Sequence, residues 1–504
     1  MPPVGKPPRA VSCRRRAVAA PALTWRARPS SSNVAPLEGA GSGMKDLTQG
    51  PITGQLIAMA VPIAIGMLFQ TLYLVVDMYF VAHLGDAAIA GVSTAGTAMF
   101  VIMALTQMLG VGTVALVSHA VGRKDQAEAN LIFNQSVTLS AICGVATLLA
   151  GWLWGGVYVR SMAADAATAA AGTSFLYYYT PGLALQFALV ALGSALRGTG
   201  IVQPTMVVQV LTVLLNTVLA PVLIAGWGTH HPLGAAGAGL ASSISVAAGV
   251  VFLWIYFARL EHYVRLEPAA LAPRAPVVRR ILNVGLPAGG EFFMMFVIIG
   301  VIYWVISAFG PAAQAGFGIG GRVMQALFLP VMALAFAAPA VAGQNFGARQ
   351  FGRVRETFRS AALLSAALML VLTLICQVRP QVFIEFFSRQ PEVVDVGATY
   401  LRVISWNFVA TGLVFTCSGL FQALGNTWPS LASSGSRLLT FVLPAVILSR
   451  LPHFSLNEVW YLSVGSVTLQ ALTSLVLLQR EFRRRLGPVA EPAIAGVNPP
   501  AAQR

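Results

Sequence analysis

The stretch QTLYLVVDMYFVAHLG, residues 70–85, places one carboxylate, Asp77, inside an apolar run. Upstream of it, residues 56–74 carry no charged side chain. An ionised Asp near the middle of a bilayer costs roughly 2.5–3.5 kcal/mol on insertion scales, so it is kept where a partner, a cavity or a proton offsets that cost. We therefore expect Asp77 to face the protein interior, where its charge state matters.

The composition of the whole chain indicates a membrane protein. Of its 504 residues 57% are hydrophobic and 10% are charged, whereas soluble domains are about 25% charged. One core cannot bury so much apolar sequence, so we predict an all-α polytopic membrane protein that sits in a lipid bilayer. The net charge of +15 could indicate a nucleic-acid partner, but the basic residues lie in short stretches between apolar runs, which is typical of membrane topology instead. The four cysteines include no CxxC pair, and we predict no metal site and no organic cofactor.

Twelve apolar segments are each long enough for the roughly 20 residues that a membrane-spanning helix needs. Their approximate limits are 55–82, 88–117, 129–154, 168–194, 203–226, 235–258, 281–307, 313–342, 357–378, 393–422, 430–449 and 458–479. Connections rich in Lys and Arg alternate with connections that hold few of them. By the positive-inside rule the basic connections are cytoplasmic, and an even number of spans puts both termini on that side.

An internal repeat relates the two halves of the chain. Pro62 and Pro287 lie 225 positions apart, and the same offset without gaps relates Gly85 to Gly310, Met99 to Met324, Gly122 to Gly347, Gly200 to Gly425 and Pro204 to Pro429. Each unit has six spans, so both units enter the membrane from the same side. This is the parallel-repeat design of secondary transporters, in which one lobe rocks against the other.

The repeat predicts the organisation of the chain. We expect an N-lobe at 44–258, a cytoplasmic linker at 259–280, a C-lobe at 281–479 and a basic cytoplasmic tail at 480–504. Residues 1–43 are interpreted as a disordered tail or as the product of a start codon placed before a true start at Met44. Asp77 maps onto Ile302, and Glu291 maps onto Gly66, so each lobe carries its own acid at a different position.

Several motifs resemble those of the MATE (multidrug and toxic compound extrusion) family. They are the stretch from Gln70 to Gly85, Ser118-His119-Ala120-Val121-Gly122 with its repeat Gly343-Gln344-Asn345-Phe346-Gly347, Leu196-Arg197-Gly198-Thr199-Gly200 with Pro204, residues 216–221 and Gly285-Leu286-Pro287. The resemblance covers about residues 44–485. It implies a secondary active multidrug exporter of the bacterial inner membrane, not an enzyme, that exchanges protons or sodium for amphipathic or cationic compounds. We expect it to be a monomer.

The resemblance also implies a coupling site. Asp77 matches the first-span acid that binds the coupling cation or proton, Tyr73 and Asn216 match its polar neighbours, and Gln70 belongs to the same motif. Tyr73 lies four residues before Asp77 and so shares its helix face. Ala220 stands where some family members have a second acid, and one branch has an acid at about Thr411. With so few anionic ligands a sodium site is disfavoured, and an apolar environment favours the neutral form of a lone carboxyl, so we prefer proton coupling.

Polar residues in other spans are candidates for lining a substrate cleft. They are Glu291, Gln107, Gln186, Asn407 and Arg322. Glu291 lies one turn after Pro287, and it either binds a cationic substrate or satisfies the backbone near the proline. Arg322, Arg402 and Arg437 lie inside or at the mouth of C-lobe spans, where pairing with Glu291 is our preferred interpretation over lining the cleft or reaching to the interface.

Two alternative functions remain open at this point. A lipid-linked oligosaccharide flippase of the same superfamily would have a cleft lined by several basic residues and often two extra spans. A membrane-embedded enzyme or channel would have a catalytic cluster or a pore of like-charged residues. The sequence shows neither pattern.

Overall fold

The computed structural model describes residues 44–228, 230–261, 263–451 and 454–487. Within these ranges the chain is all-helical, and twelve helical segments are long and apolar enough to cross a membrane. The predicted fold class and the predicted number of spans are therefore confirmed. The predictions for residues 1–43 and for the end of the chain after residue 487 lie outside the described residues.

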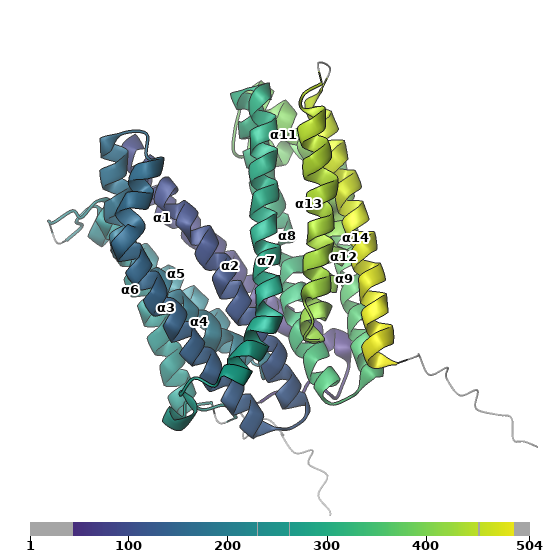
Figure 1. The fold of residues 1–504 in the computed structure, drawn as a ribbon. Coiled ribbons are helices and arrows are strands. Elements are labelled where there is room, and N and C mark those ends of the chain that lie inside the picture. Colours follow the sequence, from purple (N-terminus) through teal and green to yellow (C-terminus); the bar gives the residue numbers. More distant parts are fainter. Residues whose placement is uncertain (1–43, 229, 262, 452–453, 488–504) are drawn as a thin grey trace, which may run out of the picture. The chain divides into compact units, whose positions relative to one another are not determined.

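The helices form two groups that follow one another along the chain (Figure 1). The N-lobe consists of α1 (Ile52–Ala82), α2 (Asp86–Gly122), α3 (Gln126–Met162), α4 (Ala166–Gly198), α5 (Gln203–Ile224) and α6 (Ala235–Arg259). The C-lobe consists of α7 (Ala275–Ile306), α8 (Pro311–Gly347), α9 (Phe351–Val378), α10 (Pro380–Glu385), α11 (Pro391–Ile404), α12 (Phe408–Ala423), α13 (Trp428–Leu448) and α14 (Leu456–Leu486). Short 3₁₀ turns lie between some of these helices. They are η1 (Pro268–Ala270), η2 (Ser307–Phe309) and η3 (Ser405–Asn407).

Most helices extend beyond the predicted limits of their spans, and in α7 and α14 the extension takes in basic residues. The helix α7 begins at Ala275, so Arg279 and Arg280 lie on its first turns and not in the linker predicted at 259–280. The helix α14 continues to Leu486, so the basic residues predicted as the start of the tail are helical. Arg is a good helix former, and Arg485 there pairs with Glu481 one turn earlier, at 2.5 Å.

The linker between the lobes is held by side-chain amides of α3. Asn134 donates to the carbonyl oxygen of Arg265 at 2.8 Å. Gln135 donates to the carbonyl oxygens of Ala270 and Ala272 at 2.7 and 2.8 Å, and its own oxygen accepts from the backbone of Arg274 at 2.7 Å. These bonds satisfy backbone groups that no helix pairs, so the linker is a packed part of the N-lobe.

The tenth span is broken at η3 between α11 and α12. A break within a membrane-spanning segment leaves backbone carbonyls without helical partners, which is tolerated only when other protein groups or water pair them. Thr373 of α9 donates to the carbonyl oxygen of Ser405 at 2.9 Å, and Gln377 donates to that of Arg402 at 2.7 Å. The neighbouring helix α9 therefore supplies the missing partners.

Paired glycines bring the lobes together where α2 and α8 end. A Cβ on Gly122 would lie 2.0 Å from the carbonyl oxygen of Gln344, and a Cβ on Gly347 would lie 2.3 Å from that of His119. Gly122 with Gly347, and His119 with Gln344, are counterparts in the repeat, so the two contacts are reciprocal. Only glycine permits backbones to approach this closely.

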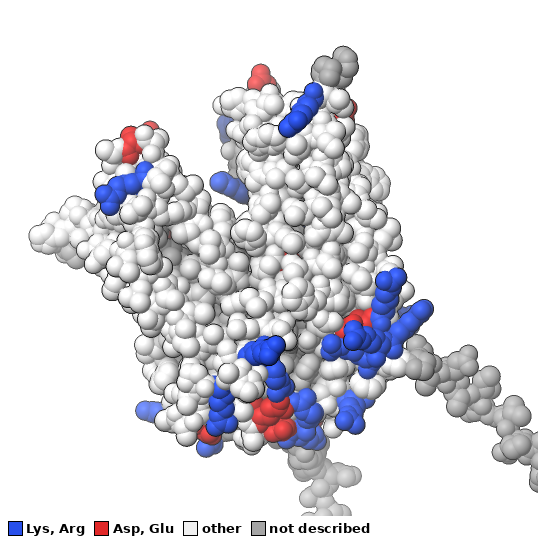
Figure 2. Space-filling model, in the orientation of Figure 1, with Lys and Arg blue, Asp and Glu red and all other residues white. Residues whose placement is uncertain are grey.

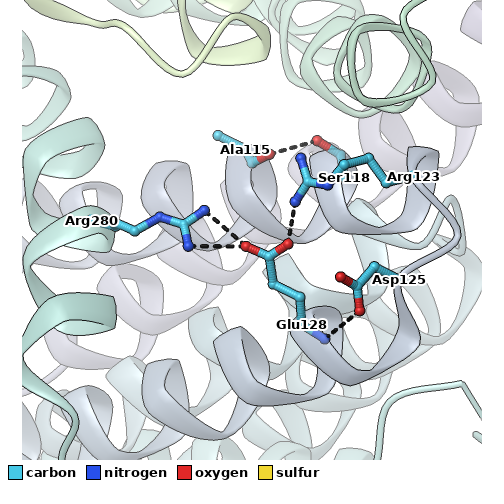
Figure 3. Close-up of polar contacts among 6 residues, drawn as sticks. All are labelled: Ala115, Ser118, Arg123, Asp125, Glu128 and Arg280. Carbon is cyan, nitrogen blue, oxygen red and sulfur yellow. Dashed lines mark hydrogen bonds and ion pairs between the residues drawn. The ribbon is translucent and has the colours of Figure 1, made fainter. Parts of the chain in front are cut away.

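Charged residues gather at the same end. The lower end of Figure 2 holds most of the visible Lys and Arg. Figure 3 shows Glu128 of α3 between two arginines, Arg123 at the end of α2 and Arg280 on α7. The Arg280–Glu128 pair, at 2.9 Å, links the lobes directly. The Asp125 carboxylate accepts from the Glu128 backbone at 2.9 Å and so caps α3.

The segment before α1 bridges the lobes at this end as well. The backbone of Lys45 donates to the carbonyl oxygen of Thr199 in the N-lobe at 3.0 Å. The backbone of Leu47 donates to the side-chain oxygen of Gln344 at 3.0 Å, and Asn345 donates to the carbonyl of Leu47 at 3.1 Å. The motifs quoted from the ends of α2, α4 and α8 therefore meet at one interface between the lobes.

Candidate functional site

Asp77 lies on α1, and its Oδ1 atom is buried with no hydrogen-bond partner in the described part of the chain. A buried carboxylate oxygen without a partner is costly, because desolvation is not repaid by a hydrogen bond. The expectation that Asp77 faces the interior agrees with this position. The arrangement leaves an acceptor available for a proton or a cation.

Neighbouring helices supply a polar cluster around this carboxyl. Tyr73, one turn earlier on α1, donates its hydroxyl hydrogen to Ser242 of α6. The side-chain nitrogen of Asn216, on α5, lies 3.5 Å from the same serine oxygen. Asp77 lies close enough to Tyr73 and to Tyr179 of α4 for electrostatic interaction. Helices α1, α4, α5 and α6 therefore contribute polar side chains to this part of the N-lobe, and Tyr73 links the group to Asp77.

The side-chain oxygen of Asn216 is buried and also lacks a partner among the described residues. The cluster thus contains two unpaired acceptor oxygens, one on Asp77 and one on Asn216. An acceptor-rich group of this kind can take up a proton or coordinate a small cation, because both bring positive charge to oxygen lone pairs. Neither requires a further charged side chain.

The remaining predicted members of the site lie differently. Gln70 is exposed and makes no hydrogen bond with the cluster in the described chain. Ala220 is fully buried in an apolar cluster with Val81 and Ile224, so the position that could carry a second acid is packed with hydrocarbon. Asp77 is then the acid of this cluster.

Sequence reasoning missed Ser242 and Tyr179. Ser242 is the shared partner of Tyr73 and Asn216. Tyr179 is buried, and its hydroxyl lies 3.7 Å from the sulfur of Met99. Both residues stand in polar runs inside predicted spans, Ser242-Ser243 and Tyr177-Tyr178-Tyr179, and such runs are a signal that could have drawn attention to them.

The carboxylate of Glu291 accepts hydrogen bonds from serine hydroxyls in the C-lobe. Its Oε2 atom accepts from Ser418 of α12 at 3.0 Å and from Ser430 of α13 at 2.7 Å. Ser434, one turn further along α13, is also a hydrogen-bond partner of this carboxylate. None of Arg322, Arg402 and Arg437 forms an ion pair with Glu291 in the described residues, so the preferred pairing interpretation is wrong. The serines of α12 and α13 occupy the positions around the carboxylate.

The other proposed cleft residues are spread over the fold. Gln107 on α2 and Gln186 on α4 are half-buried, and Arg322 on α8 is exposed. Asn407 in η3 is buried, and its side-chain oxygen has no partner among the described residues. No hydrogen bond within the described chain joins any two of the cleft candidates. The described residues also contain no group of His, Cys, Asp and Glu able to hold a metal ion.

Comparison with known families decides what this arrangement belongs to. The family model MatE matches residues 62–222 and 287–447, which is more than half of the chain. The chain belongs to the MatE family. Both ends of the second matched range lie 225 positions after those of the first, so the predicted repeat is confirmed. MatE proteins are transporters, so the enzyme alternative is excluded.

Bacterial relatives of this MatE protein match over most of their length. The probable multidrug resistance protein YoeA of Bacillus subtilis (strain 168) is 23% identical, over 79% of this chain and 88% of the relative. The multidrug export protein MepA of Staphylococcus haemolyticus (strain JCSC1435) is 25% identical, over 81% of this chain and 88% of the relative. The MatE protein is thus a multi-pass membrane protein with bacterial homologues.

Solved structures share the fold. A structure titled as the outward-facing conformation of a multidrug resistance MATE transporter of the MOP superfamily matches with a TM-score of 0.82 and 24% identity, covering 89% of this chain and 99% of that one. A MOP superfamily transporter from Pyrococcus furiosus, whose title describes a binding pocket of reverse polarity, also matches with a TM-score of 0.82 and 24% identity, covering 90% of this chain and 100% of that one.

Proposed function

We propose that this MatE protein is a secondary active multidrug exporter that antiports protons, in preference to sodium, against amphipathic or cationic compounds by alternating access. The printed names of the bacterial relatives, a multidrug resistance protein and multidrug export proteins, support drug export. The observation that carries the coupling is the buried, unpaired Oδ1 atom of Asp77 beside Tyr73, Asn216 and Ser242.

Protonation of Asp77 from the outer side removes a buried charge and turns its acceptor into a donor. The carboxyl can then bond to the free oxygen of Asn216, which draws α1 toward α5 and reduces the space within the N-lobe. Deprotonation toward the cytoplasm reverses the change. One charge that crosses about 100 mV supplies about 2.3 kcal/mol, enough for a concentration gradient of about 50-fold.

The ligand set favours a proton over sodium. A sodium ion needs several oxygen ligands at once, with enough negative charge to replace its hydration shell. Here the buried Ala220 supplies none, and the serine at 242 already accepts the hydroxyl hydrogen of Tyr73. A proton needs one carboxylate oxygen, and Asp77 has one free.

The orientation follows from the distribution of charge. Basic residues lie near the ends of α2, α7 and α9, where the lobes meet: Arg123, Lys124, Arg280 and Arg353. We place this end of the protein in the cytoplasm by the positive-inside rule. Both termini then lie in the cytoplasm, and the protein sits in the bacterial inner membrane. We expect it to act as a monomer.

The test is dye transport in inverted membrane vesicles under an imposed pH gradient or an imposed sodium gradient. We expect the wild type to respond to the pH gradient, and Asp77→Asn to lose that response. Asp86→Asn is the matched control, because Asp86 is an exposed acid on the first turn of α2. Full proton-driven transport by Asp77→Asn would remove the coupling role, and a response to sodium alone would reverse the choice of ion.

A further inference from the structure

A second charged residue lies inside the membrane domain, and nothing in the coupling scheme uses it. Arg437 lies within α13, which spans Trp428–Leu448. Its Nε atom is buried without a partner, and no described residue makes an ion pair or hydrogen bond with its guanidinium. A cation within a span costs roughly 2.5–3.5 kcal/mol on insertion scales, and such residues commonly mark a substrate or ion pathway.

A cluster of aromatic side chains lies near this guanidinium. The Tyr400 hydroxyl on α11 lies within electrostatic reach of Arg437 and of Tyr303 on α7. The ring of Tyr400 packs against Phe317 and Trp460, with centroids 5.2 and 4.8 Å apart. An ionic contact to the buried Nε atom of Arg437 is stronger than one made in bulk solvent, because the local dielectric constant is lower.

The methionine beside Tyr400 has its repeat counterpart beside Tyr179 in the N-lobe. Tyr400 lies 3.7 Å from the sulfur of Met324, and Tyr179 lies 3.7 Å from the sulfur of Met99. Met324 and Met99 are related by the repeat offset, whereas Tyr400 and Tyr179 are 221 positions apart, so the two tyrosines contact equivalent methionines from positions one helical turn apart. Tyr179 lies within electrostatic reach of the Asp77 carboxylate, whereas Tyr400 lies within electrostatic reach of the Arg437 guanidinium. Each lobe thus has a charged group near a buried tyrosine, a carboxylate in the N-lobe and a guanidinium in the C-lobe, although Asp77 and Arg437 are not counterparts in the repeat.

The fold itself does not require a cation at this position. The N-lobe counterpart of Arg437 is Thr212, whose hydroxyl bonds to the carbonyl of Val208 on its own helix at 2.7 Å. One lobe thus packs the position with a small neutral residue. A structural need would arise in both copies of the repeat, so the charge in the C-lobe calls for another explanation.

The fold does not require a charge at the position of Glu291 either. Its repeat counterpart is Gly66, and the side-chain oxygen of Gln209 fills that place, 2.0 Å from where a Cβ would lie. The N-lobe therefore satisfies the position with a neutral amide from α5. The serine partners of Glu291 at 430 and 434 share a face of α13 with Arg437, because they are spaced four and three residues apart. On α13, Ser430 and Arg437 are seven residues apart, which is about 10 Å of helix rise, and Ser434 lies between them.

We propose that Arg437 binds the carboxylate of a transported compound while Glu291 binds its protonated amine, so that the C-lobe selects zwitterionic amphiphiles. A guanidinium suits a carboxylate because its nitrogens donate two parallel hydrogen bonds. The absence of an ion pair between Glu291 and Arg437 leaves both charges available to a ligand. This inference rests on the proposed export function and names one substrate class for it.

The test is equilibrium binding to the purified protein in detergent, which does not depend on transport. The probes are a xanthene dye with a free benzoate carboxyl, which is a zwitterion, and the methyl ester of the same dye, which is a cation. Fluorescence anisotropy then reports a Kd for each. We expect the wild type to bind the zwitterion at least tenfold more tightly than the ester.

Variants locate the subsite. Arg437→Gln should raise the Kd of the zwitterion at least tenfold and leave that of the ester within twofold, and Arg437→Lys should restore part of the difference. Arg450→Gln, an exposed arginine beyond the end of α13, is the control and should change neither. Equal affinity of the wild type for both dyes, or an equal loss for both in Arg437→Gln, would overturn the proposal.

Vesicle transport of the ester separates this proposal from the proposed function. Proton-driven ester transport that is lost in Asp77→Asn and kept in Arg437→Gln supports coupling in the N-lobe together with a carboxylate subsite in the C-lobe. Selective binding of the zwitterion without any proton-driven transport would overturn the exporter and leave the subsite standing. Intact proton-driven transport with no selectivity between the dyes would overturn the carboxylate subsite and leave the exporter standing.

Discussion

Replacing Gly122 by alanine should force the two lobes apart at the end where α2 and α8 meet. A Cβ at this position would lie 2.0 Å from the carbonyl oxygen of Gln344, whereas ordinary contact begins at 3.4 Å. The helices must therefore separate locally by about 1.4 Å, the difference between these two distances. Both groups are fixed to helix backbones, so no side-chain rotation can relieve the clash.

The clash destabilises the conformer that the structure shows, in which the lobes touch at this end. Overpacking a tight contact costs about 1–3 kcal/mol. If a cost of about 2 kcal/mol is felt only when the lobes touch, the ratio of touching to separated conformers falls about 30-fold. An exporter that works by alternating access would then spend most of its time open at the basic end.

Pulsed electron paramagnetic resonance can measure that separation. Nitroxide labels at Ala127→Cys on α3 and Gly352→Cys on α9 report it, because both positions are exposed near the junction and are counterparts in the repeat. The four natural cysteines are replaced by alanine in this background. Gly96→Ala is the control, since Gly96 also lies on α2 but has nothing within 4 Å of its Cβ position. If Gly122→Ala and Gly96→Ala give superimposable distance distributions, the reasoning from the glycine contact is refuted.

Three further predictions concern stability. Gln135→Ala removes the amide that holds the linker backbone, and leaving buried groups unpaired should cost about 1–3 kcal/mol; the melting temperature in detergent should fall by several degrees, and a value equal to that of Gln107→Ala would count against it. Glu128→Gln removes two partly exposed ion pairs worth less than about 1 kcal/mol each. The small fall in melting temperature that it causes should disappear in high salt, and a fall that persists there would contradict this reasoning. Burial raises the pKa of Asp46, but hydrogen bonds from Thr48 and nearby cations outweigh it and hold the pKa below its ordinary value of 3.8. Ionised Asp46 therefore stabilises the protein above pH 3.8 and this contribution is lost as the pH falls through the lowered pKa; Asp46→Asn should flatten the acid side of the stability curve, and an unchanged curve would contradict the assignment.

The coupling site was predictable in part. Asp77 stands out in the sequence because an acid in an apolar run is costly, and Tyr73 shares its helix face by spacing alone. Asn216 came from the family resemblance, and the structure links it to Tyr73 through Ser242. The serine itself could not be chosen from many others, because the facing side of α6 depends on how that helix is rotated in the lobe.

In the C-lobe, too, the sequence did not predict which side chains are in contact. The sequence places Glu291 and Arg437 in apolar spans, where opposite charges are expected to pair, and the structure instead surrounds Glu291 with serine hydroxyls. Pairing depends on distances between side chains on different helices, and the spacing along one helix does not determine them. The break at η3 was missed for a related reason, since its stability comes from Thr373 and Gln377 on the neighbouring α9.

The sequence by itself determined that this protein crosses the membrane twelve times as two copies of one unit, because apolar length and a constant repeat offset are properties of the chain alone. It also predicted that Asp77 faces the protein interior, because an acid exposed to lipid in such a run is costly. Only the tertiary structure decided which groups meet. The rotation and approach of the helices bring Ser242 to Tyr73, set Gly122 against the backbone of α8, and leave the buried Nε atom of Arg437 without a partner among the described residues. These contacts join residues far apart in the sequence, so only packing of the whole fold creates them.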